Sequence, residues 1–169
     1  MTDAFKYWRS FNAIRAGDLS LVDAWVRGNV DQAAVLFSLM PLPFAVTPLS
    51  LDFHNSLLYA ALFFWLYRKR VFTPVSLWFF LLYPSLALYT GMGLRDTFVF
   101  VFIVMAVQWT REGRWWFALL PLYLLYMIKF QNFFILGPIL LLYAVFGIRR
   151  SGMSAGKALA VLLVALVVL

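Results

Sequence analysis

The sequence contains no cysteine and little charge. Only 12% of its 169 residues are charged, about half the share typical of soluble domains, whereas 64% are hydrophobic and 20% are aromatic. Without cysteine the chain cannot form a disulfide, a zinc–thiolate site, an iron–sulfur cluster or a thiol nucleophile. The shortage of charge excludes an ordinary water-soluble globule, and the wealth of apolar residues excludes a disordered chain.

Long apolar runs take the place of the missing charge. Several approach about 20 residues, the length that a helix needs to cross the hydrocarbon core of a bilayer. We therefore expect an all-α fold, a polytopic transmembrane helical bundle with an N-terminal amphipathic interfacial helix. The interfacial segment is predicted over residues 1–32, and a transmembrane domain of about four to six spans over residues 33–169.

The basic excess is explained best by a membrane. Fourteen Lys and Arg against seven Asp and Glu give a net charge of +7. Basic residues collect in the cytoplasmic loops of membrane proteins. No basic stripe with interleaved aromatic residues lies outside the apolar runs, so nucleic acid is not an expected partner. Membrane lipid is expected, together with partner membrane helices.

The N-terminal segment has the spacing of an amphipathic helix. Phe5, Trp8, Phe11 and Ile14 recur at helical intervals with basic residues between them. A second short helical pattern follows Asp18. A helix lying at the membrane interface and an ordinary packed surface helix both fit this pattern, and the choice stays open.

Six apolar segments follow. They are Ala33 to about Thr47, Leu49–Tyr67, Val71 to about Thr90, Thr97 to about Thr110, Trp115–Gly147 and Ala155–Leu169. The first is broken by Pro41 and Pro43 and is short for a span, so we expect it to be bent or re-entrant. The last is also short and stops while still apolar, which suggests that the chain is a fragment of a longer protein.

Three basic clusters predict the topology. They are Arg68-Lys69-Arg70, Arg111 with Arg114, and Arg149-Arg150, and all three should be cytoplasmic. The run between the last two clusters must then leave the cytoplasmic side and return. Its 33 residues are too many for one upright span, so we predict a hairpin with a break at Lys129–Asn132. A single tilted span with a buried lysine is the alternative.

With this topology, polar residues from three separate stretches lie at the extracytoplasmic end of the bundle. A charged group inside a membrane costs about 2.5–3.5 kcal/mol on insertion scales, so each is expected to have a structural or functional role. The three stretches are Asp52, His54 and Asn55, then Arg95 and Asp96, and finally Lys129, Gln131 and Asn132. We therefore predict that these stretches converge on one polar site.

Each residue also has a structural explanation. Arg95 and Asp96 suit a helix start, where a carboxylate stabilises the exposed N–H groups. Asp52 could cap its own helix, and Lys129 could anchor a helix at the interface. His54 is expected to be a packed or interfacial histidine, because one histidine with scattered carboxylates is too little for a zinc site.

As a site, the cluster suits phosphate chemistry. Arg95 and Lys129 could hold a phosphate or pyrophosphate, arginine through its forked donors and lysine as a point charge. Asp52 or Asp96 could accept a proton from an attacking sugar hydroxyl as the catalytic residue. The other polar members are assigned to substrate binding: Gln131, Asn132 and Asn55. No metal and no cofactor are expected.

One stretch resembles a known pattern. Pro84-Ser85 opens a segment that ends in Gly91-Met92-Gly93-Leu94-Arg95-Asp96, and Lys129-Phe130-Gln131 follows later in an apolar run. This pattern resembles bacterial O-antigen and exopolysaccharide polymerases and related C-type glycosyltransferases, in which an Asn like Asn55 is also frequent in an earlier helix. The resemblance covers about residues 50–147.

The resemblance implies a bacterial inner-membrane protein of surface-polysaccharide assembly. Such a protein would act on a polyprenyl-pyrophosphate-linked glycan at the periplasmic face, with Arg95 and Lys129 on the pyrophosphate, Asp96 orienting Arg95 and Asp52 as a base. Those polymerases have about ten or more spans, more than this chain supplies. The alternative from another class is a non-catalytic membrane subunit that packs against partner helices.

Thiol labelling would test the topology, because every introduced cysteine reports alone in this cysteine-free chain. We predict that Lys69→Cys, Gly113→Cys and Arg149→Cys react from the cytoplasmic side in intact cells. Met92→Cys and Gln131→Cys should react from the outside. Labelling of positions 92 and 131 from opposite faces would contradict a shared polar site.

Overall fold

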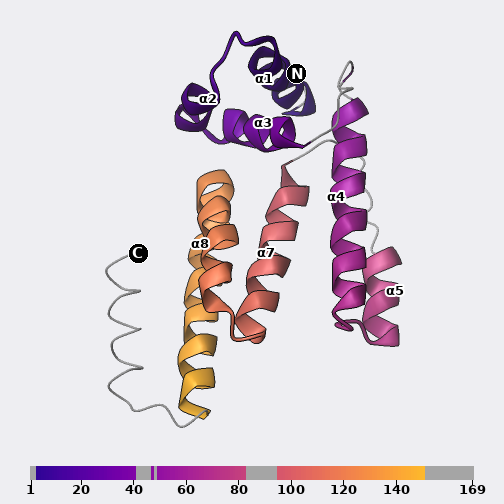
Figure 1. The fold of residues 1–169 in the computed structure, drawn as a ribbon, viewed down its shortest axis with the longest axis vertical. Coiled ribbons are helices and arrows are strands. Elements are labelled where there is room, and N and C mark those ends of the chain that lie inside the picture. The colour runs from indigo at the N-terminus through magenta and orange to yellow at the C-terminus, as the bar shows by residue number, and fades with distance from the viewer. Residues whose placement is uncertain (1–2, 41–46, 48, 83–94, 151–169) are drawn as a thin grey trace. The chain divides into compact units, whose positions relative to one another are not determined.

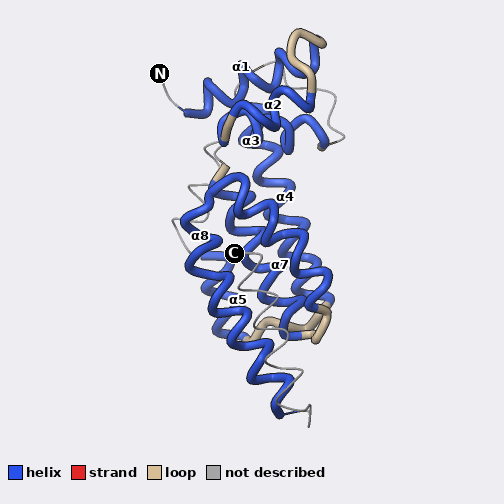
Figure 2. The backbone as a smooth tube through the Cα atoms, turned by 90° about the vertical axis from the view of Figure 1, so that its left-hand side faces the viewer, coloured by secondary structure: helices blue, strands red, loops and turns tan. Residues whose placement is uncertain are grey.

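The computed structural model describes residues 3–40, 47, 49–82 and 95–150 (Figure 1). Within these residues the chain forms seven helices. Over the same residues the tube in Figure 2 is coloured as helix and loop, with no strand. The prediction of an all-α fold is thereby confirmed. The chain divides into two compact units, residues 1–101 and residues 102–169, and each is taken in turn.

Three short helices open the first unit: α1 (Asp3–Ala16), α2 (Leu21–Arg27) and α3 (Asn29–Leu39). Helix α3 packs against both α1 and α2. Their core contains Leu19, Ala24 and Val35, with partly buried apolar residues around it. The boundary predicted between residues 32 and 33 therefore falls inside α3. Part of the first apolar segment belongs to this three-helix group, and Pro41 and Pro43 lie outside the described residues.

The apolar side of α1 is covered by protein. Tyr7 and Phe11 are almost fully buried, and only Phe5 is markedly exposed among the large apolar residues of this helix. Burial by neighbouring helices favours the packed surface helix over the interfacial one. Ser20 caps the start of α2, because its hydroxyl accepts a hydrogen bond from the backbone N–H of Asp23 at 3.1 Å. The cap is therefore Ser20 and not Asp18, because the Ser20 hydroxyl reaches the backbone N–H of the third helical residue.

A helical hairpin of α4 (Leu49–Arg68) and α5 (Pro74–Leu82) follows. Helix α4 coincides with the predicted second segment. Tyr59 stacks on Phe80 at 4.8 Å between ring centroids and donates a hydrogen bond from its hydroxyl to the Phe80 carbonyl, while Phe63 stacks on Phe72 at 5.5 Å. The Tyr59–Phe80 stack holds α5 against α4, and the Phe63–Phe72 stack holds the turn that leads into α5. Of the third predicted segment, residues 83–90 lie outside the described residues, as do Pro84 and the turn at 91–93.

The fourth predicted segment is α7 (Asp96–Arg111), which ends in a left-handed turn. The N–H of Arg114 bonds to the carbonyl of Trp109 at 2.9 Å, and the N–H of Gly113 to that of Thr110 at 3.1 Å. These two bonds form a Schellman motif, which needs a positive φ at Gly113 (+73°). Glycine adopts this conformation without the steric cost of a Cβ atom.

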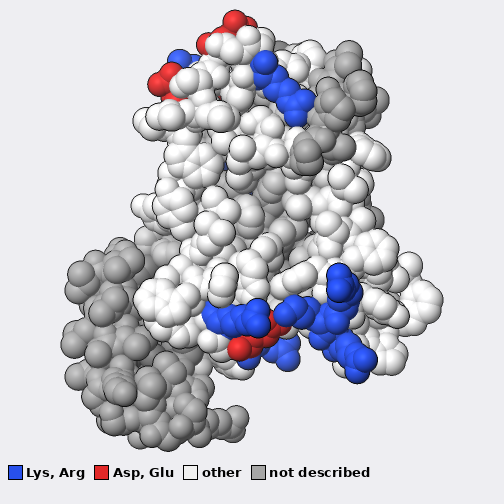
Figure 3. All heavy atoms as spheres, viewed as in Figure 1, with Lys and Arg blue, Asp and Glu red and all other residues white. Residues whose placement is uncertain are grey.

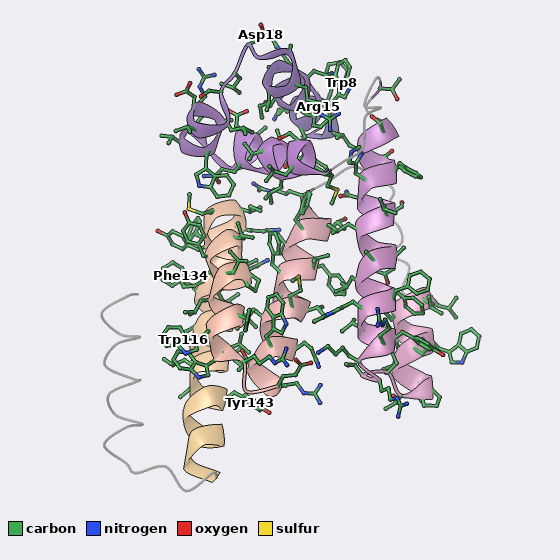
Figure 4. All side chains as sticks on the ribbon, in the orientation of Figure 1. Trp8, Arg15, Asp18, Trp116, Phe134 and Tyr143 are labelled. Atoms are coloured by element: carbon green, nitrogen blue, oxygen red, sulfur yellow. The ribbon has the colours of Figure 1, made fainter. Side chains whose placement is uncertain are left out.

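The last described helix, α8 (Trp115–Arg150), is broken at Lys129, where φ is −151° and ψ is 76°. The two arms on either side run in opposite directions (Figures 1 and 4). Figure 4 shows Trp116 at a level between Phe134 and Tyr143, an order that one straight helix cannot give. Tyr126 and Phe133 contact across the turn at 5.3 Å. The predicted break at Lys129–Asn132 is confirmed.

Among the described residues, one helix is long and apolar enough to cross a membrane, Trp115–Tyr143, and little of it is buried within the protein. The break at Lys129 divides α8 into arms of about 20 Å and about 30 Å at 1.5 Å per residue. A multi-pass arrangement stays a prediction.

The left-handed turn at Gly113 gives a stability prediction. We expect Gly113→Ala to lower the free energy of unfolding by about 1 kcal/mol, because an alanine there is strained although no atom lies within 4 Å of the added Cβ. Thermal unfolding in detergent would measure the loss. Gly137→Ala is the control, since its Cβ meets only the Phe133 ring at 3.8 Å in an ordinary helix. Equal midpoints for the two variants would contradict the strain at Gly113.

Candidate functional site

The first two turns of α4 carry the first predicted polar stretch. Leu51, His54 and Asn55 are fully buried, as expected for positions i, i+3 and i+4 on one helix face. Asp52 is half-buried, and Phe53 beside it is 62% exposed. The buried face therefore carries the imidazole and the amide, whereas the carboxylate lies on a more open side of the same turn.

His54 is a packed histidine, one of the two structural roles predicted for it. Its ring makes edge contacts with Phe11 of α1 at 6.2 Å and Phe37 of α3 at 6.3 Å. Its Nδ1 forms a hydrogen bond with the carbonyl of Ser50, and within the described residues its buried Nε2 has no hydrogen-bond partner. No group of three or more potential metal-ligating side chains is found among the described residues.

Phe37 connects the starts of α4 and α7. Its fully buried ring contacts His54 of α4 on one side and Phe98 of α7 on another, the latter at 4.8 Å in an edge-to-face arrangement. The polar residues at the start of α7 therefore belong to the same unit as those of α4. Two of the three predicted polar stretches lie at helix starts that meet at one buried aromatic side chain.

Arg95 and Asp96 form the start of α7. The Arg95 carbonyl accepts the N–H of Val99 at 3.1 Å, which places Arg95 at the cap position and Asp96 in the first turn. Both side chains are half-buried. A carboxylate in the first turn is favoured by the helix dipole, so the predicted structural role of Asp96 fits, and its position beside Arg95 also fits a role in a site.

The third stretch lies in the second unit. Lys129 is the residue at which α8 breaks, and it is half-buried like Asn132, whereas Gln131 is exposed. The backbone break is at Lys129, and Gln131 and Asn132 lie in the first turn of the arm that follows. The convergence of this stretch with the other two stays a prediction.

The charges of α4 and α7 are distributed alike. Each helix has an aspartate in its first turn, Asp52 or Asp96, and an arginine in its last, Arg68 or Arg111. Lys and Arg gather at the carboxyl end of α4 in Figure 3, and the sides of that helix carry none. This distribution suits the helix dipole.

Two features were missed by sequence reasoning. Phe37 was one of many apolar residues in a predicted membrane segment, and its spacing gives no sign that it joins three helices. The other is a hollow at the α4–α5 turn, lined by Tyr67, Arg68, Arg70, Phe72, Thr73, Pro74, Leu77 and Trp78. The Thr-Pro-Val-Ser sequence that begins α5 was an available signal for its shape, because threonine before proline is typical of a helix start.

No protein-family model, curated protein or solved structure matches this chain. The pattern of residues 84–96 and 129–131 stays a resemblance, and the roles it implies stay predictions.

The aromatic contact at Phe37 can be tested by truncation. We expect Phe37→Ala to destabilise the first unit by about 3–5 kcal/mol, because it removes a fully buried ring between His54 and Phe98. Phe53→Ala is the matched control on the exposed side of α4 and should change stability little. Limited proteolysis and thermal unfolding would measure both. Similar behaviour of the two variants would show that Phe37 does not join these helices.

Proposed function

We propose that this chain is a multi-pass protein of the bacterial inner membrane that acts in surface-polysaccharide assembly. It binds a polyprenyl-pyrophosphate-linked glycan at the periplasmic face. The observation that supports this most is the meeting of the α4 and α7 starts through His54, Phe37 and Phe98. It brings a carboxylate stretch and an arginine from separate parts of the sequence into one unit.

The membrane location rests on composition and on the distribution of charge. Helix α4 has 20 residues, about 30 Å, with its basic residues collected at the carboxyl end. Large apolar side chains cover its outer surface and that of α5, for example Phe64, Trp78 and Phe79, each more than 60% exposed. Such surfaces are stable in lipid and costly in water.

In the proposed site, Arg95 binds the pyrophosphate through its forked donors, and Asp96 orients Arg95. The sequence pattern also assigns Lys129, Gln131 and Asn132 to this ligand. The half-buried position of Arg95 favours the role, because a guanidinium partly removed from water attracts a phosphate more strongly.

Asp52 is the proposed base. A sugar hydroxyl attacks the anomeric carbon of the lipid-linked glycan, Asp52 takes the hydroxyl proton, and polyprenyl pyrophosphate leaves with the electron pair of the broken C–O bond. The carboxylate lies in the first turn of α4 and keeps access to solvent. Asn55 is fully buried on the other side of that turn, and its role in substrate binding stays part of the proposal.

A second function has support from the exposed aromatic surfaces. A non-catalytic membrane subunit would cover them with partner helices, since packing of complementary surfaces drives helix association in membranes. Trp115 and Trp116 stack on each other at 3.9 Å, and Trp116 is 68% exposed. Purification discriminates the two functions, because a stable monodisperse chain in detergent is not an obligate subunit.

Replacement of Arg95 tests the proposed function. We expect Arg95→Ala to reduce polymer formation by about 10²-fold or more, because a charged group that stabilises the leaving pyrophosphate is lost. Polymer length on a gel, with protein level measured by blotting, is the readout. Arg114→Ala is the control, since this exposed arginine lies beyond the other end of α7. Unchanged polymer with a normal level of the Arg95 variant would exclude Arg95 from the mechanism.

A further inference from the structure

The turn between α4 and α5 borders an open hollow. It lies at the carboxyl end of α4, whereas Asp52 of the proposed glycan site lies at the amino end. Arg68 and Arg70 contribute positive charge to its wall, and Tyr67, Leu77 and Trp78 contribute apolar surface. The hollow therefore combines two forked cations with an aromatic wall, on the part of the chain where the basic triplet ends a long apolar helix.

The backbone at Arg70 is unusual for an arginine. The N–H of Val71 bonds to the Leu66 carbonyl at 3.2 Å, and the N–H of Arg70 to the Tyr67 carbonyl at 3.0 Å. This is the same Schellman motif that ends α7, and it gives Arg70 a φ of +53°.

Glycine occupies the corresponding position at the end of α7, Gly113, and a glycine with positive φ, Gly17, also follows α1. Among the described residues outside glycine, Arg70 alone has a positive φ. An arginine there is strained where a glycine would be relaxed, and strained residues cluster at sites where the side chain has a function.

The two guanidinium groups are available to a ligand. Among the residues that the structure describes, no carboxylate pairs with Arg68 or Arg70, and both are exposed. The Thr73 hydroxyl at the hollow is already used, because Thr73 Oγ1 accepts the N–H of Ser76 at 3.2 Å while Ser76 Oγ accepts the N–H of Thr73 at 2.8 Å. The charged donors of the hollow are the two guanidinium groups, and they favour an anion with several acceptor oxygens.

The wall of the hollow indicates what else the ligand carries. Tyr67 is 60% exposed and Trp78 62% exposed, and these are the residue types that lie at the headgroup level of a bilayer. A small soluble anion would leave this apolar surface in water. A ligand with a phosphate beside a hydrocarbon chain would cover the arginines and the aromatic side chains together.

We propose that the hollow binds the phosphate of an anionic phospholipid headgroup, held by Arg68 and Arg70, with the adjoining acyl chain against Leu77 and Trp78. This lipid site is separate from the glycan site and does not depend on it. Juxtamembrane basic residues attract anionic lipid by charge alone, and the fixed turn adds a defined position for the headgroup.

Fluorescence quenching would test the lipid site on the full chain in detergent. The probe is phosphatidylglycerol with brominated acyl chains, which quenches nearby tryptophans. The Trp78→Phe variant identifies the contribution of Trp78 among the seven tryptophans. We expect saturable quenching of Trp78 by the brominated anionic lipid, and weaker quenching by brominated phosphatidylcholine.

Arg70→Gly separates binding from folding, because glycine is the preferred residue at this left-handed position. We expect about fivefold weaker lipid binding with a thermal midpoint no lower than that of the parent chain. Arg68→Gln should weaken binding similarly and leaves the backbone at residue 70 unchanged. Arg9→Ala, which removes an exposed arginine from α1, is the charge-matched control and should bind like the parent.

Three results would overturn the proposal. Equal quenching by the zwitterionic lipid would show that the headgroup charge is not recognised. Equal loss in Arg9→Ala would show that only net charge matters. Inorganic phosphate would be compared with sodium chloride at equal ionic strength. If phosphate abolished the quenching and sodium chloride did not, the hollow would bind the free anion instead of a lipid.

Discussion

The edge-to-face contacts of Phe37 are the interaction on which the first unit depends. A phenyl ring that contacts an imidazole and a second phenyl ring gains from the opposite charges of ring edges and faces as well as from the burial of apolar area. Phe37 comes from a short helix that packs on two others, yet its ring meets α4 and α7 at their starts. The polar residues at those starts keep their positions because of an apolar contact beneath them.

Much of the helical framework could be predicted from the sequence. The bounds of α4 and α7 follow from apolar runs that end at arginine, and the break at Lys129 follows from the need to return the next basic cluster to the same side. These arguments need only the lengths of the apolar runs and the positions of the basic residues. The start of α2 shows the limit, because Asp18 and Ser20 are both good caps and only the turn geometry selects Ser20.

The candidate site could be predicted only in part. The free-energy cost of placing a charged side chain in a membrane singles out Asp52, Arg95 and Lys129 from the sequence alone. Their neighbours in space depend on which apolar side chains pack together, and apolar residues in a membrane-like sequence are too uniform to show this. Arg70 illustrates the same limit, since a basic triplet is an ordinary loop signal and only the backbone reveals that one member occupies a glycine position.

The break in α8 has a consequence for how such a chain enters a bilayer. The arm before Lys129 is about 20 Å long, less than the hydrocarbon thickness, and almost no loop separates it from the arm that follows. An arm this short does not span the hydrocarbon core alone. Both arms would therefore have to enter a bilayer together as one helical hairpin, with Lys129 at its leading tip.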